Sequence, residues 1–196
     1  RRMRLRGRRP PQLRLASLPD AEFRSLVVPG RQATINPSIA SGGRGFFCTV
    51  SSNDEENDGA MAPFDGHSSE IWIAELDSDL SVLDIQRIDL PPREGSNLGR
   101  MWDSRPFQWK GAWWLLASWS FYRSPDRCQL TLCRLDGIAI VEQQLLSSPM
   151  QAALEKNWMP LIRGGRLELI YWIDPMEVMT YRGGSDLSHR RIARWG

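Results

Sequence analysis

Short apolar runs, each bounded by turn residues, recur along the chain and predict an all-β protein. The runs at 46–50, 112–117 and 167–173 are rich in aromatic and aliphatic side chains, which fit the pleated surface of a strand. A further short strand is expected at 21–28. Helical periodicity is weak throughout, and only residues 150–154 are expected to form a single helical turn.

Two hairpins are predicted between these runs. The first lies at 71–90 and turns at residues 77–79, where Asp, Ser and Asp follow one another. The second lies at 128–146 and turns at Asp136 and Gly137. An Asp-Gly pair between alternating apolar residues is a strong hairpin signal, so both segments are expected to be antiparallel strand pairs.

A polar cluster, a proline, a glycine turn and an apolar run follow one another three times along the chain. The prolines of the three copies, Pro37, Pro106 and Pro160, stand 69 and 54 residues apart. Self-similarity at a period of this size indicates a repeat architecture such as a propeller. We expect repeat units at about 31–90, 100–148 and 155–196, the last of them incomplete.

Each unit contains a strand with the polar cluster, an apolar strand and an outer hairpin, which makes four strands. Four-stranded sheets are the blades of β-propellers, and closed propellers have about 4–8 blades. We therefore predict an all-β fold class, a partial propeller of about three four-stranded antiparallel blades. Further C-terminal blades or an oligomer partner are expected to complete it, because open sheet edges invite aggregation.

Two stretches lack periodic apolar residues and are expected to be unstructured. Residues 1–14 contain seven arginines and no acid, and the segment 1–20 is expected to be a basic, disordered N-terminal segment. Residues 51–69 are expected to form a long polar loop. Without the seven arginines the chain has 18 basic and 23 acidic residues, so no nucleic-acid partner is expected.

The residue counts argue against a metal centre and a membrane span. Three cysteines and two histidines are too few nitrogen and sulfur ligands to favour zinc. An odd number of cysteines indicates buried free thiols in a reducing compartment, and a cytoplasmic location is expected. No apolar run approaches the ~20 residues that a membrane-spanning helix needs.

The polar clusters of the three units are expected to meet in the central channel of the propeller. The candidate site residues are Asn36, Ser38, Asp103, Arg105, Glu155, Lys156, Asn157 and Trp158. Carboxylates are the acid–base groups of glycoside cleavage, and Arg and Lys hold phosphates or sugar acids. The alternative is structural: Asp103 and Arg105 form an ion pair between strands, and Glu155 and Lys156 form a solvated edge.

At these residues the chain resembles the five-bladed propellers of glycoside hydrolase family 130, the β-mannoside phosphorylases and hydrolases. The resemblance covers about residues 31–181 and rests on Asn-Pro, on Asp-x-Arg before Trp-x-Gly, and on Lys-Asn-Trp. It implies that the chain is the N-terminal part of such a propeller and acts on β-mannoside-type oligosaccharides. The family's central motif is Glu-Asp-Pro-Arg, whereas this chain has Trp102 and Ser104 on either side of Asp103.

The resemblance also implies roles for the candidate residues. Asp103 is the candidate general acid, and Arg105 and Lys156 are candidates for holding phosphate or sugar. Asn36 and Asn157 would contact sugar hydroxyls. No cofactor is implied, and inorganic phosphate is the co-substrate of phosphorolysis. Hydrolysis would need a base, and Glu155 is the candidate for that role.

Two other functions remain open. The first is a non-catalytic glycan-binding or scaffold propeller that accompanies a sugar-transferring enzyme, which the altered central motif favours. The second is a fructosidase-like or arabinosidase-like enzyme of the related five-bladed group, whose first carboxylate should lie near Asn36, where the chain has none. We expect no turnover by the 196-residue chain alone, because its phosphate-holding residues are incomplete without later blades.

Overall fold

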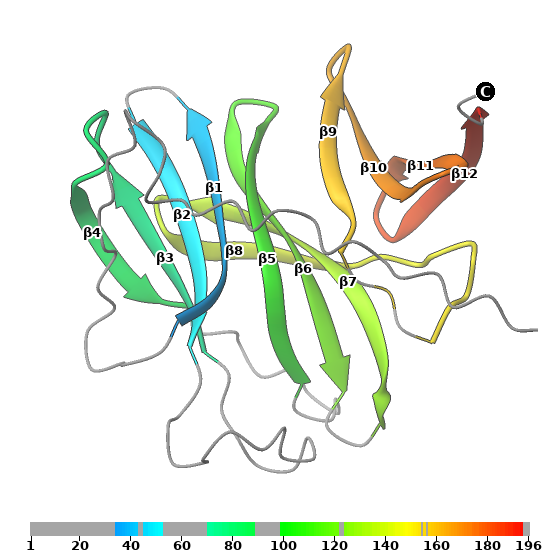
Figure 1. The fold of residues 1–196 in the computed structure, drawn as a ribbon, viewed down its shortest axis with the longest axis horizontal. Helices are drawn as coiled ribbons and strands as arrows, with labels where there is room; N and C mark the ends of the chain where they lie inside the picture. The colour runs from blue at the N-terminus through cyan, green and yellow to red at the C-terminus, as the bar shows by residue number, and fades with distance from the viewer. Residues whose placement is uncertain are drawn as a thin grey trace, which may run out of the picture.

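The described part of the protein forms three antiparallel sheets of four strands each (Figure 1). The computed structural model describes residues 34–42, 45–52, 70–88, 99–121, 124–153, 155 and 157–193. Over these residues the chain is all-β and contains no helix. The basic segment 1–20, the strand expected at 21–28 and residues 53–69 of the expected loop lie outside the described residues.

Within each sheet the strands pair in chain order. The strands of the first sheet are β1 (Thr34–Gly42), β2 (Gly45–Ser52), β3 (Glu70–Leu76) and β4 (Val82–Arg87). Those of the second sheet are β5 (Gly99–Trp109), β6 (Ala112–Phe121), β7 (Ser124–Asp136) and β8 (Ala139–Leu145). Those of the third sheet are β9 (Met159–Arg163), β10 (Arg166–Ile173), β11 (Met176–Gly183) and β12 (Asp186–Ala193).

The strands match the apolar runs and hairpins expected from the sequence, with three differences. The third unit was expected to be incomplete, but its sheet has four strands. Ser51 and Ser52 end β2 and do not begin a loop. Residues 150–153 form no helical turn, because Ser148 accepts a bond from the Gln151 N–H in a local turn.

Tight turns fix the register of the first hairpin in two of the sheets. Trp109 pairs with Ala112, and Lys110 and Gly111 between them have positive φ angles of 50° and 74°. Gly164 and Gly165 make the corresponding turn between β9 and β10, with φ angles of 56° and 75°. Two consecutive positive φ angles define the type I′ turn, whose twist matches that of a hairpin.

The middle sheet is buried on both faces. Leu115 belongs to the apolar cluster between the first and second sheets, together with Phe47 and Ile73. Leu116, the next residue of β6, belongs to the cluster between the second and third sheets, together with Leu169. Strands that are buried on both faces have continuous apolar sequences, which explains the run at 112–117.

The first strands of the three sheets are neighbours, and side-chain bonds join the sheets. β5 contacts both β1 and β9. The Thr49 hydroxyl on β2 donates to the Ser104 carbonyl on β5 at 2.8 Å, and the Trp109 indole N–H donates to the Gly165 carbonyl at 2.9 Å. The strands that carry the polar clusters therefore lie side by side.

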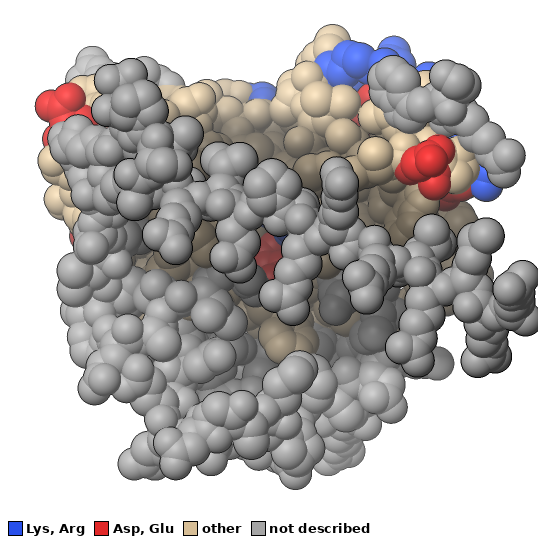
Figure 2. All heavy atoms as spheres, viewed as in Figure 1, with Lys and Arg blue, Asp and Glu red and all other residues tan. Residues whose placement is uncertain are grey.

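Charged side chains gather over two of the hairpins. Figure 2 shows positive side chains over the β9–β10 hairpin, where Arg163 and Arg166 are exposed, and acidic ones over the β3–β4 hairpin. The cysteines Cys48, Cys128 and Cys133 are free and buried, as expected from their odd number. No helix in the described part of the chain is long and apolar enough to cross a membrane.

Candidate functional site

Irregularities at corresponding places position the polar clusters. In β1 the register shifts between Ile35 and Ser38, so that Asn36 and Pro37 face a single residue of β2. In β5 the same shift places Asp103 and Ser104 opposite a single residue of β6. An inserted residue of this kind is a β-bulge, which bends the strand and redirects its side chains. The bulge therefore turns the polar cluster away from the regular pleat.

The cluster residues Asn36, Asp103 and Asn157 occupy equivalent positions. Each stands seven places before the first turn residue of its hairpin (43 minus 36, 110 minus 103, 164 minus 157). Asp103 and Asn157 have positive φ angles of 49° and 64°, a region that Asn and Asp enter more readily than other non-glycine residues.

The proline alignment expected from the sequence is wrong in the first copy. Pro106 and Pro160 stand four places before their turns, whereas Pro37 stands six places before its own. The structural spacing of the first two clusters is therefore 67 residues, from Asn36 to Asp103, and not 69. Proline has no backbone N–H. It can therefore occupy different bulge and edge positions, as long as no hydrogen bond between the strands needs a donor there.

A cavity of about 210 Å³ lies where the three clusters meet. Its walls are formed by residues of β1, of β5 and of the segment before β9: Pro37, Ser38, Asp103, Ser104, Arg105 and Asn157. The structure thus brings together four of the candidate residues, from all three repeat units. Asn36 is described only in its backbone, and Lys156 lies outside the described residues.

Arg105 connects two of the clusters across this cavity. Its Nη1 donates to the backbone carbonyl of Asp103 at 3.0 Å, and its Nη2 donates to the Asn157 Oδ1 at 3.5 Å. Both acceptors are neutral oxygens. A guanidinium held in this way keeps its charge available to an anionic or polyhydroxylated ligand, for which its planar set of donors is suited.

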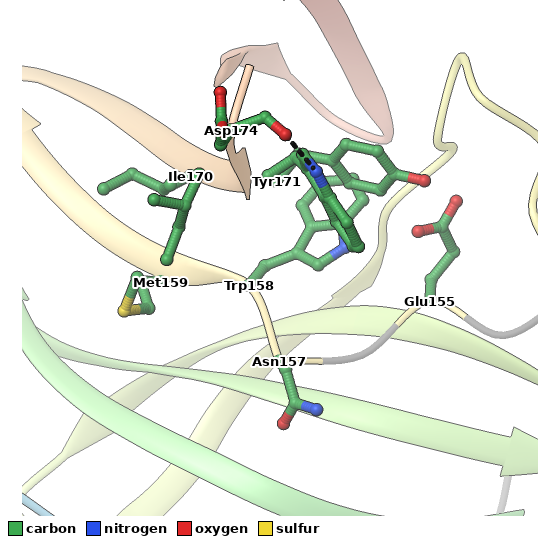
Figure 3. Close-up of a pocket in the computed structure, with 9 residues that line it drawn as sticks. Glu155, Asn157, Trp158, Met159, Ile170, Tyr171 and Asp174 are labelled. Carbon is green, nitrogen blue, oxygen red and sulfur yellow. Dashed lines mark hydrogen bonds between the residues drawn. The ribbon is translucent and has the colours of Figure 1, made fainter. Parts of the chain in front are cut away.

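A second and larger cavity, of about 580 Å³, lies beside the lower ends of β9 and β10 (Figure 3). Asn157 lines both cavities. The other polar and aromatic residues of the larger cavity are Glu155, Trp158, Tyr171, Trp172 and Asp174. Glu155 and Trp158, which were expected beside Asp103, therefore line the larger cavity and not the smaller one.

Glu155 is buried in an unusual environment. The residue is only 3% exposed, and its backbone N–H donates to the Cys128 carbonyl at 2.9 Å. Neither carboxylate oxygen has a hydrogen-bond partner within the described part of the chain. Buried polar atoms are normally bonded, so such an atom calls for an explanation.

Aromatic side chains surround this carboxylate. Trp158 and Tyr171 meet edge to face, with ring centroids 5.1 Å apart, and Figure 3 shows the Tyr171 hydroxyl pointing toward the Glu155 carboxylate. Burial raises the pKa of the Tyr171 phenol, and the charges of Glu155 and Glu177 raise it further. Trp172 is 59% exposed, and its indole N–H donates to the Asp174 carbonyl at 2.9 Å.

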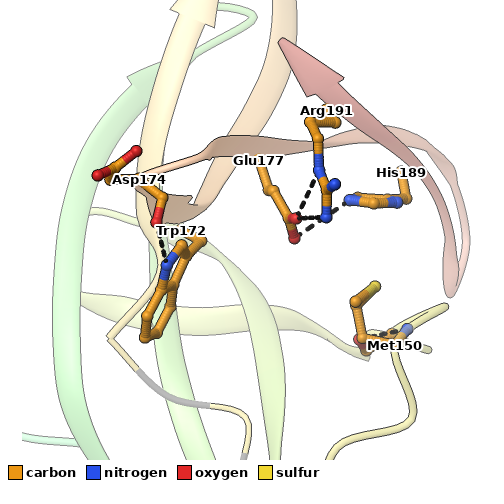
Figure 4. A network of polar contacts seen from close by, with 7 residues as sticks. Met150, Trp172, Asp174, Glu177, His189 and Arg191 are labelled. Carbon is orange, nitrogen blue, oxygen red and sulfur yellow. Dashed lines mark hydrogen bonds and ion pairs between the residues drawn. The ribbon is translucent and has the colours of Figure 1, made fainter. Parts of the chain in front are cut away.

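A separate ionic cluster lies next to this cavity on β11 and β12 (Figure 4). Arg191 donates from Nη2 and Nε to the Glu177 Oε1 at 2.7 and 3.1 Å, and the His189 Nε2 lies 3.4 Å from the Glu177 Oε2. The bond from Arg191 is the main reason that the pKa of Glu177 is lowered, and His189 contributes to the same shift. Arg191 and His189 are therefore the partners of the Glu177 carboxylate.

Sequence reasoning missed Tyr171, Trp172 and Asp174 as cavity residues. Tyr171 and Trp172 belong to an apolar run that predicts only a strand, and nothing local marks a register shift between Ile170 and Trp172. Within the residues that the structure describes, no group of His, Cys, Asp and Glu could hold a metal ion. Neither a protein-family model nor a curated protein matches the chain.

Proposed function

We propose that this protein is a carbohydrate-active β-propeller of the glycoside phosphorylase and hydrolase type, acting on β-mannoside-type glycans with Asp103 as the general acid. One observation carries the proposal: Ser38, Asp103, Arg105 and Asn157, from three repeat units, line one cavity. The propeller itself is supported by three sheets of equal construction whose first strands are neighbours. The resemblance to the mannoside phosphorylases favours five blades.

Asp103 and Arg105 would have different roles in the reaction. In phosphorolysis a phosphate oxygen attacks the anomeric carbon, the bond to the leaving sugar oxygen breaks, and Asp103 supplies the proton to that oxygen. The Arg105 guanidinium, which among the described residues bonds only the neutral oxygens of Asp103 and Asn157, would hold the phosphate or a sugar hydroxyl. Asn157 would accept or donate a hydrogen bond to the sugar.

The position of Glu155 favours phosphorolysis over hydrolysis. An inverting hydrolase needs a second carboxylate to activate water opposite the general acid. Glu155 was the candidate for that role, but it lines the larger cavity and not the one that contains Asp103. A phosphorylase needs no such base, because phosphate is itself the nucleophile.

A non-catalytic glycan-binding propeller is the second candidate. Its support is Trp102, which stands where the mannoside phosphorylases have a glutamate, and the small size of the cavity. A volume of about 210 Å³ lies below the ~300–1,000 Å³ of typical ligand pockets. Such a cavity suits one sugar residue at the end of a chain.

The replacement Asp103→Asn tests the proposal. In a protein that carries the complete propeller, we expect it to abolish release of mannose 1-phosphate from β-1,4-mannobiose and phosphate, because an amide cannot supply the proton and general-acid assistance is typically worth about 10²–10⁴-fold. Binding of mannobiose, measured by calorimetry, should change little. The matched control is Asp136→Asn in the exposed β7–β8 turn.

The two candidates predict different results. Binding of mannobiose without turnover in the wild-type complete propeller would support the glycan-binding candidate. Turnover that persists in Asp103→Asn would exclude Asp103 as the general acid, and a protein that binds no mannoside would contradict both candidates.

A further inference from the structure

We propose that the larger cavity, beside Glu155, binds an organic ammonium cation that carries methyl groups. This inference concerns a different ligand from the glycan proposed above and does not depend on it. It follows from three properties of the cavity: the charge of its lining residues, the lack of a bonded partner for a buried carboxylate, and its aromatic walls.

The charge of the cavity is negative. Within the described part of the chain, its charged lining residues are both acidic, Glu155 and Asp174. A carboxylate that is buried without a partner is costly, and it needs a positive charge or hydrogen-bond donors close by. Glu155 is 3% exposed and has no hydrogen bond to either oxygen from the described residues. A cation bound in the cavity would offset this charge through space, since both Glu155 oxygens are buried and are not themselves open to the cavity.

The nearby cations of β12 do not serve Glu155. Arg191 and His189 both contact the Glu177 carboxylate, at 2.7 and 3.4 Å, and neither of them lines the cavity. Figure 4 shows that these three side chains point toward one another. The Tyr171 hydroxyl points toward the Glu155 carboxylate in Figure 3, so this acid stands beside the aromatic wall.

The walls favour a methylated cation over a bare amine. Trp158, Tyr171 and Trp172 line the cavity together with the aliphatic Met159, Ile170 and Ile173. The face of an aromatic ring attracts a cation within about 6 Å, and aromatic cages of this kind recognise quaternary ammonium groups. The bond from the Trp172 indole to the Asp174 carbonyl holds this exposed ring in place.

Other ligands fit the cavity less well. A neutral sugar could donate hydroxyl groups to Glu155 but would leave its negative charge uncompensated. A metal ion would need several ligands, and the described residues contain no suitable cluster. The volume of about 580 Å³ is within the range of small-molecule pockets, ~300–1,000 Å³, so the cation can be an organic one.

Choline and its uncharged isostere 3,3-dimethyl-1-butanol test the proposal, because they differ in charge and hardly in shape. We expect calorimetric titration of the full chain to show binding of choline, and binding of the alcohol to be at least about tenfold weaker. Equal affinity for the two compounds, or no binding of choline by the wild-type protein, would overturn the proposal. Displacement of choline by mannobiose would assign the cavity to sugar and overturn it as well.

Glu155→Gln should weaken choline binding by at least about tenfold, whereas Glu142→Gln, which removes an exposed carboxylate from β8, should not change it. Circular dichroism checks that the variants fold. If Glu155→Gln does not fold, Trp172→Leu is the test of the cation site. Trp172 is exposed, so its replacement should be tolerated. We expect that variant to bind choline several-fold more weakly, and wild-type affinity in it would contradict the aromatic site.

Discussion

Single residues at the polar clusters combine an unusual backbone with a functional side chain. Asp103 and Asn157 have left-handed φ angles, which cost most residues about 1–2 kcal/mol but cost Asp and Asn less. The same two side chains line the smaller cavity. Residue type at these positions is therefore constrained twice, by the left-handed backbone that it must allow and by the ligand that it would contact.

Glu177 gives a pH-dependent prediction. The pKa of this carboxyl is lowered in the folded protein, first by its bond from Arg191, so its ionised form stabilises the fold. This contribution is present above the pKa of an unfolded glutamate, about 4.3, and is lost as pH falls through the lower folded value. Glu177→Gln should therefore lower the urea midpoint at pH 7, and its difference from wild type should shrink as the pH is lowered from 7 toward 3.

The matched control for this experiment is Glu142→Gln, whose carboxylate pairs with Arg134 at 3.1 Å on the surface. Exposed pairs contribute only about 0–1 kcal/mol, so this variant should stay close to wild type at both pH values. A deficit of Glu177→Gln that persists at pH 3 would show that the glutamate acts through packing and not through its charge.

At the scale of elements, β6 is a strand that packs against both neighbouring sheets. Its consecutive leucines face different clusters, Leu115 toward the first sheet and Leu116 toward the third. The continuous apolar run in the sequence already indicated a strand covered on both faces. One strand therefore supplies the side chains that join both pairs of sheets.

Leu116→Ala should destabilise the protein by about 2–5 kcal/mol, because it leaves a cavity between the second and third sheets. Leu116 is 1% exposed, whereas Leu83 on β4 is 63% exposed, and Leu83→Ala should cost less than about 0.5 kcal/mol. Urea unfolding of both variants measures the difference. Similar losses in the two variants would contradict the burial of β6.

At the scale of the whole molecule, the smaller cavity exists only because neighbouring sheets are held in register. The Thr49 hydroxyl on β2, which is fully buried, donates to the carbonyl of Ser104 at 2.8 Å. Ser104 itself lines the smaller cavity. This bond therefore fixes the first sheet against the strand that carries Asp103.

Thr49→Val should lower the free energy of unfolding by about 1–3 kcal/mol, because it removes a buried donor from a carbonyl while preserving the shape of the side chain. The control is Ser118→Ala on β6, since the buried Ser118 hydroxyl has no hydrogen-bond partner in the described part of the chain. That change should be close to neutral. Equal effects of the two substitutions in chemical denaturation would show that the bond between the sheets contributes little.

The sequence by itself determined the strands, the hairpins and the three polar clusters. Alternation, aromatic and aliphatic content and Gly or Asp-Gly turns are local signals, because they act through φ and ψ and through the two faces of a single strand. The polar clusters that contain Asn36, Asp103 and Asn157 were visible, but alignment by the prolines gave the wrong spacing for the first copy, and the pairing register corrected it. The family and the sugar chemistry remain predictions.

Only the tertiary structure decided which side chains share a cavity. Asp103 and Arg105 meet Asn157 over more than 50 residues of intervening chain, and no local pattern fixes the distance between two sheets. Glu155 stands only two residues before Asn157, but of the two cavities that Asn157 lines it reaches only the larger one, with Tyr171 and Trp172. The physical reason is that a cavity is bounded by packing between sheets and by register shifts within them, and both arise from contacts between residues far apart in the sequence.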